Sequence, residues 1–124
     1  MVHYTYHIDI EKKLIIETFK GEMTVQKYKE LKEQEFANPD FDSTYSVVAD
    51  LRLITLQYNE KELRKLVDFL VEHKTNIGQR KSALVATKPI QVAASVMFNQ
   101  LAQELPFHIK IFNTLEGALH WVSK

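Results

Sequence analysis

Residues 46–63 decide the fold, and they read Ser46-Val-Val-Ala-Asp-Leu-Arg-Leu-Ile-Thr-Leu-Gln-Tyr-Asn-Glu-Lys-Glu-Leu63. The run from Ser46 to Leu51 is apolar on both faces, which predicts a strand in the centre of a covered sheet. Asn59 can then cap a helix, and Glu62 stands three residues later in the capping-box position. A buried strand that leads into a helix is typical of an α/β protein.

The sequence on both sides continues this alternation. Alternating or continuous apolar runs predict strands at 3–10, 14–20, 46–51, 81–87 and 107–112. Thr24, Asn59, Pro89 and Thr114 mark the starts of four helices. We therefore predict one α/β domain, 1–124, with a five-stranded, mostly parallel mixed sheet, an N-terminal β-hairpin and four helices.

Apolar positions predict the buried face of each element. On the first strand, the face expected to be buried carries Tyr4, Tyr6, Ile8 and Ile10. Helical spacing predicts four core stripes. In chain order these stripes are Val25, Tyr28, Leu31 and Phe36; Leu63, Leu66, Val67, Leu70 and Ile77; Ile90, Ala94, Met97, Phe98, Leu101 and Leu105; and Leu115, Ala118, Leu119 and Val122.

Composition excludes several classes of protein. The chain has no cysteine, so disulfides, thiolate metal sites and cysteine nucleophiles are excluded. A formal net charge of zero argues against nucleic acid as a partner, and the nearest basic group, Lys74, Arg80 and Lys81, is interpreted as solvated. There is no apolar run long enough for a membrane span and no signal-peptide pattern, so we expect a soluble, cytoplasmic protein.

The histidines do not form a metal motif. His3 and His7 would lie about 13 Å apart on a strand, and His73, His108 and His120 fall on separate predicted elements. No Gly-rich phosphate loop or nucleophile elbow is present either. We predict no metal and no cofactor.

The best candidate site lies where the third and fourth strands are expected to end, because ligands bind there in α/β sheets. It would bring together Asp50, Arg52, Thr55, Tyr58 and Lys88, with Thr87 beside Lys88. Two interpretations stay open. Asp50 can brace the loop, which the residues favour, or Arg52 and Lys88 can hold an anionic ligand.

The third predicted helix carries no charge between Pro89 and Gln103. Val92 and Val96 fall four residues apart on the side away from its predicted core stripe, where a surface helix normally shows charges. This pattern indicates a contact surface for a homodimer or partner, or a lid over an apolar pocket.

Several segments together resemble the STAS-like family of small bacterial proteins. They are Phe19-Lys-Gly-Glu-Met-Thr24, Phe41-Asp, Val48-Ala-Asp-Leu-Arg52, Ala83-Leu-Val-Ala86 and Phe112-Asn-Thr-Leu-Glu-Gly-Ala-Leu-His-Trp121. The resemblance covers nearly the whole chain. It implies the fold of sporulation anti-sigma factor antagonists and a distant likeness to CRAL-TRIO lipid-binding domains.

The resemblance also raises the question of a phosphorylation switch. In the antagonists a phosphorylated Ser begins the second helix, after an Asp that Asp50 resembles. The corresponding segment here, 52–58, contains no Ser, and Thr55 is its only aliphatic hydroxyl. Thr55 is therefore the only candidate in this segment for the modified position.

Three functions follow as hypotheses. The first, implied by the resemblance, is a non-catalytic STAS-like regulatory or binding domain that binds a protein partner or a small ligand. The second is a carrier of an apolar, lipid-like ligand, which predicts a cavity under the third helix lined by Met97 and Phe98. The third is a small enzyme that uses Asp50 and Arg52.

Overall fold

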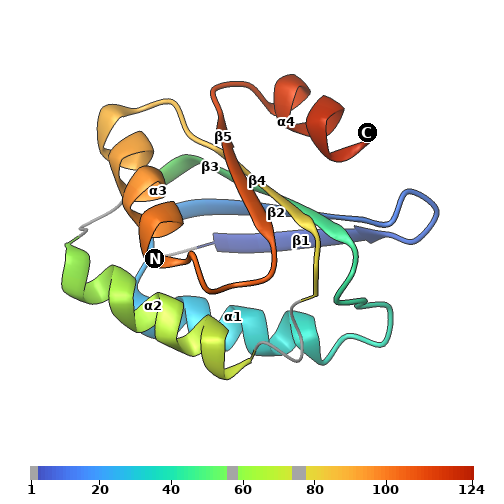
Figure 1. Cartoon of the computed structure of the whole chain (residues 1–124), viewed down its shortest axis with the longest axis horizontal. Helices are drawn as coiled ribbons and strands as arrows, with labels where there is room; N and C mark the ends of the chain where they lie inside the picture. The colour runs from blue at the N-terminus through green and yellow to red at the C-terminus, as the bar shows by residue number, and fades with distance from the viewer. Residues whose placement is uncertain (1–2, 56–58, 74–77) are drawn as a thin grey trace.

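The computed structural model describes residues 3–55, 59–73 and 78–124, which form a five-stranded sheet with helices on both faces (Figure 1). The strands are β1 (His3–Asp9), β2 (Leu14–Glu22), β3 (Ser46–Thr55), β4 (Lys81–Val85) and β5 (His108–Phe112). The helices are α1 (Val25–Phe36), α2 (Glu60–Glu72), α3 (Pro89–Leu101) and α4 (Leu115–Val122). The predicted fold class and element order are confirmed.

The order of strands in the sheet follows their order in the chain, β1-β2-β3-β4-β5. β1 pairs with β2 antiparallel, and every later pair is parallel. When successive right-handed crossovers move in the same direction along a sheet, their helices lie on the same face of that sheet. Accordingly α1, α2 and α3 cover one face and α4 covers the other (Figure 1).

The predicted helix starts are confirmed by their caps. The side chains of Thr24, Asn59 and Thr114 each accept a backbone N–H three residues later, at 3.2, 2.9 and 3.0 Å. Pro89 is the first residue of α3, where its missing N–H has no helical partner to lose.

Two strands run further than predicted, because pairing between β2 and β3 resumes after a bulge. Thr18 pairs with Asp50 but Lys20 pairs with Leu53, so β3 carries one extra residue there. Gly21 does not end β2; it takes a φ of 89° and stays in the ladder opposite Ile54. Arg52 and Thr55 are therefore strand residues, and Asp50 does not end β3.

Two of the predicted helix stripes need correction. The most buried residues of α1 are Lys32 and Glu35, which the apolar stripe omitted. α3 buries Gln91, Ala94 and Ser95, so it is rotated and leaves Ile90 47% exposed. Ile77 lies outside the described residues, and α2 ends at Glu72.

On the hairpin, Ile10 belongs to the turn and is 55% exposed, so it is not part of the buried face predicted for the first strand.

Gln91 ties α3 to β3. Its Oε1 accepts the backbone N–H groups of Thr87 and Lys88 at 3.2 and 3.1 Å. Its Nε2 donates to the carbonyls of Arg52 and Ile54 at 3.2 and 3.1 Å. The side chain is fully buried, so these bonds hold the start of α3 against the extension of β3.

We expect Gln91→Met to lower the free energy of unfolding by about 2 kcal/mol or more, because buried backbone groups lose their partners. Urea denaturation measures the change. Gln100→Met on the exposed side of the same helix is the control and should change stability by less than about 0.5 kcal/mol. Equal effects of the two substitutions would contradict this role of Gln91.

Candidate functional site

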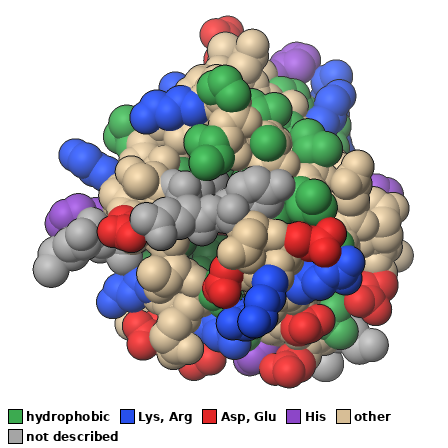
Figure 2. All heavy atoms as spheres, turned by 90° about the vertical axis from the view of Figure 1, so that its left-hand side faces the viewer, with side chains coloured by type: hydrophobic (Ala, Val, Ile, Leu, Met, Phe, Trp, Pro, Cys, Tyr) green, Lys and Arg blue, Asp and Glu red, His purple; other side chains and the backbone are tan. Residues whose placement is uncertain are grey.

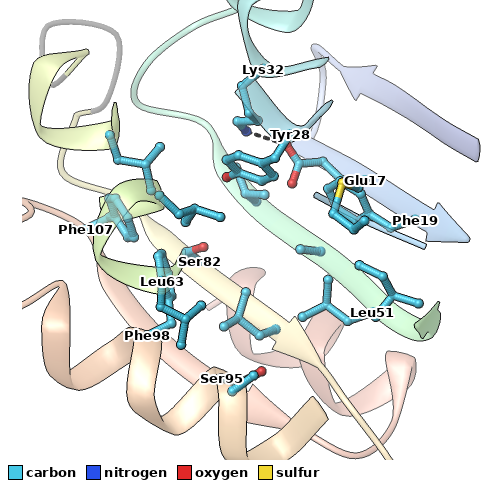
Figure 3. A pocket seen from close by; sticks show the side chains of 18 of the residues that line it. Glu17, Phe19, Tyr28, Lys32, Leu51, Leu63, Ser82, Ser95, Phe98 and Phe107 are labelled. Carbon is cyan, nitrogen blue, oxygen red and sulfur yellow. Dashed lines mark hydrogen bonds and ion pairs between the residues drawn. The ribbon is translucent and has the colours of Figure 1, made fainter. Parts of the chain in front are cut away.

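A pocket of about 140 Å³ lies between the sheet and helices α1, α2 and α3 (Figure 3). Its floor comes from alternate strand residues, such as Val47 and Ala49, because side chains two apart share a face. Leu63 of α2 and Phe98 of α3 line the sides. The walls are therefore mainly apolar.

One end of this pocket is polar. Figure 3 shows Glu17, Tyr28 and Lys32 together at this end and Ser95 at the other. Arg80 also lines the pocket. A mainly apolar pocket with a few polar groups is the usual form of a small-ligand site.

A buried ion cluster forms the polar end. Lys32 Nζ donates to Glu17 Oε2 at 2.5 Å and to Glu35 Oε2 at 2.6 Å. Tyr4 OH donates to Glu35 Oε1 at 2.7 Å. The side chains of Glu17, Lys32 and Glu35 are each at most 3% exposed. The cluster thus joins β1, β2 and α1.

The two carboxyls have opposite pKa shifts. Burial, and secondarily the charge of Glu35, raises the pKa of Glu17 to about 8. Burial also opposes ionisation of Glu35, but Lys32 and the hydrogen bonds around it hold the pKa of that carboxyl below its ordinary value. Near neutral pH the two carboxyls therefore carry one proton and one negative charge, which Lys32 balances.

Arg80 is the second buried cation at the pocket. It is 8% exposed, and its guanidinium carbon lies 5.7 Å from the centre of the Phe107 ring. Its Nε and Nη1 have no hydrogen-bond partner within the described parts of the chain. Burial lowers the pKa of Arg80, although arginine stays protonated in proteins. The prediction that Arg80 is a solvated charge was wrong, and Lys74 lies outside the described residues.

The predicted site residues lie elsewhere. Asp50 lies between Ala49 and Leu51 on β3, and both of these residues line the pocket. Because successive side chains of a strand point to opposite faces, the Asp50 side chain points to the face of the sheet away from the pocket. Asp50 Oδ1 accepts from Arg52 Nε at 2.9 Å, and Oδ2 accepts from Nη2 at 2.8 Å. These hydrogen bonds hold the pKa of Asp50 below its ordinary value.

The other predicted site residues are only partly brought together. Thr55 and Lys88 are exposed, and Tyr58 lies outside the described residues. Gln91 joins the backbone of Arg52 to that of Lys88, as described above. The geometry thus unites Asp50 with Arg52 as an ion pair, and ligand binding by this group stays a prediction.

Sequence reasoning missed the pocket's polar residues, although two signals were present. Glu17 shares its strand face with Ile15 and Phe19, which are both buried. Lys32 stands four residues after Tyr28 and so shares the buried face of α1. Arg80 gave no signal except its place just before a buried strand. The pocket predicted for α3 does contain Phe98, but Met97 is not among its lining residues.

In residues 3–55, 59–73 and 78–124 there is no group of three or more His, Asp or Glu side chains placed to hold a metal ion. None of the helices described there is long and apolar enough to cross a membrane.

We expect stability to fall as pH rises from about 4.5 to about 8, the ordinary and raised pKa values of Glu17. The unfolded chain loses this proton in that window and the folded protein keeps it, so rising pH favours unfolding. Glu17→Gln should flatten this fall. Urea denaturation at a series of pH values measures it.

Glu22→Gln, an exposed position on the same strand, is the matched control and should keep the slope of the parent protein. The pKa of Glu35 is lowered from its ordinary value of 4.5, so this carboxyl changes the pH dependence of stability only below about pH 4.5, outside this window. The same slope in Glu17→Gln and in the parent would refute the assignment.

No protein-family model and no curated protein matches the chain. Solved structures do match. An uncharacterized protein of the DUF3478 family with a SpoIIAA-like fold, from Shewanella loihica PV-4, has a TM-score of 0.64 at 15% identity, over 98% of this chain and 95% of that chain. An anti-sigma factor antagonist from Mycobacterium paratuberculosis has a TM-score of 0.63 at 16% identity, over 100% of this chain and 96% of that chain.

Both likenesses extend over almost the full length of each chain, and at these identities they concern the fold. They agree with the mixed sheet and the N-terminal hairpin described above. The resemblance inferred from the sequence is confirmed at this level: the chain has a STAS-like, SpoIIAA-like fold.

Proposed function

We propose that the chain is a single, non-catalytic STAS-like regulatory domain, 1–124, which binds a small, mainly apolar ligand in the cytoplasm. The pocket between the sheet and α1–α3 carries this proposal. Its volume of about 140 Å³ is close to that of an apolar cavity of about 150 Å³ known to bind benzene. The size favours a compact ligand over the long lipid of a lipid carrier.

The enzyme alternative has less support. A general base must be free to accept a proton, and its pKa should lie near the working pH. Asp50 instead accepts two hydrogen bonds from the Arg52 side chain, and its pKa is lowered. This geometry favours the bracing interpretation of the pair.

We expect benzene, used as an apolar probe, to raise the melting temperature of the parent protein because it binds only the folded state. Ala94→Leu should abolish this rise, because Ala94 is buried and lines the pocket, so that the larger side chain fills it. Differential scanning calorimetry with and without benzene measures both effects.

Ala93→Leu is the control, because Ala93 is exposed on the same helix and outside the pocket lining. It should keep the benzene response. If the parent protein shows no response, the pocket does not bind apolar molecules and the proposed function fails.

A second role, contact with a protein partner or a second copy, is favoured by exposed apolar side chains near α3. Leu53, Ile90 and Val96 are 61, 47 and 43% exposed, whereas Val92 is half-buried. Figure 2 shows hydrophobic side chains close together on this side of the molecule. A similar structure is named an anti-sigma factor antagonist, and we propose a protein partner here by analogy.

Phosphorylation of Thr55, which is exposed, would be one way to regulate contact with a partner.

If this surface joins two copies, Val96→Glu should shift the protein from dimer to monomer, because a charge would be buried in the contact. Sedimentation equilibrium over a range of concentrations measures this. Gln34→Glu on the exposed side of α1 is the control and should leave the dimer intact. A parent protein that is monomeric throughout would exclude the homodimer.

A further inference from the structure

We infer that the pocket selects small carboxylic acids, with the carboxylate bound by Arg80 and the apolar body lying between the sheet and α2 and α3. This inference rests on the proposed function and names its ligand class. It starts from a buried arginine that lines an apolar pocket. A buried charge normally has a partner, because desolvation without one is costly.

The guanidinium is placed to receive a ligand. Nε and Nη1 of Arg80 are buried donors without a partner in the described residues. Arg80 lies over the Phe107 ring, with 5.7 Å between the guanidinium carbon and the ring centre, which restricts its movement. Nη1 shares the terminal edge of the guanidinium with Nη2, and two N–H donors on one edge match the two oxygens of a carboxylate, so the expected complex is bidentate.

The surrounding charges also favour an anion. Lys32 is committed to Glu17 and Glu35 at 2.5 and 2.6 Å, and Tyr4 donates to Glu35. Because the two carboxyls share one proton near neutral pH, these groups are balanced without Arg80. Among the described residues Arg80 forms no ion pair, and its Nε and Nη1 also lack a hydrogen-bond partner there, so a bound monoanion would supply the counter-charge.

The pocket limits the rest of the ligand. Its volume suits a body about the size of a benzene ring. Leu66 and Leu70 of α2 and Phe98 of α3 offer apolar contacts to that body. Benzoate is therefore a suitable probe, and benzamide has the same shape without the charge.

The test is isothermal titration calorimetry of the parent protein with benzoate and with benzamide near neutral pH. We expect benzoate to bind at least about tenfold more tightly, because only the anion forms charge-assisted hydrogen bonds. In Arg80→Met this preference should disappear, while the benzene-induced rise in melting temperature remains. Arg64→Met is the control, because the Arg64 side chain is 60% exposed on α2, and it should keep the preference.

Stability gives a second readout. Removal of a structural arginine would destabilise the fold. Removal of a buried charge that has no partner among the described residues should leave the free energy of unfolding unchanged or raise it. If Arg80→Met does not fold, Arg80→Gln provides the same comparison, because it also removes the charge.

The outcomes separate the two proposals. Equal binding of benzoate and benzamide by the parent, or a preference for benzoate that survives in Arg80→Met, overturns the carboxylate inference while the pocket still binds apolar molecules. If benzene, benzamide and benzoate all fail to bind, the proposed function itself fails.

Discussion

Lys32 makes the interaction on which the arrangement of this molecule depends. It bridges Glu17 in the middle of β2 and Glu35 on its own helix, out of contact with water. Such a buried charge is not strong evidence for stability, but loss of either partner leaves an expensive unpaired group. The bridge therefore restricts how α1 can lie on the sheet. Together with the Gln91 bonds that hold α3, it keeps two of the three covering helices in place around the pocket.

The fold was largely predictable from the sequence because its signals are local. Caps at Thr24, Asn59 and Thr114 set the helix starts, and apolar runs set the strands. The predictions failed where tertiary structure decides. The length of β3 depends on a bulge opposite β2, and the rotation of α3 depends on a glutamine that finds four backbone partners.

The candidate site was less predictable for the same reason. Asp50 and Arg52 attract attention in the sequence because they interrupt an apolar run, yet they partner each other on the face opposite the pocket. Glu17, Lys32 and Arg80 come from three distant segments, and only the folded sheet brings them to one pocket. Polar residues on otherwise apolar faces were the available signal for the first two. For Arg80, the two donors that lack a partner among the described residues become visible only in three dimensions.

The places of the two proposed binding sites in the fold follow from its layers. α4 seals one face of the sheet with a packed cluster that includes Val48, Val85 and Ala118. The other face is covered by three helices, which leave room for a ligand. α3 has one side against this pocket and exposed Ile90 and Val96 on the outside. A ligand that shifts α3 would thereby alter the surface that we propose for a partner.

A crystal structure of the protein grown with benzoate would show whether Arg80 binds a carboxylate in the pocket. We expect benzoate in the pocket, with its carboxylate oxygens about 2.8 Å from Nη1 and Nη2 of Arg80 and its ring beside Phe98. A pocket without benzoate at saturating concentration, with the Arg80 guanidinium paired to Glu17 instead, would contradict this expectation.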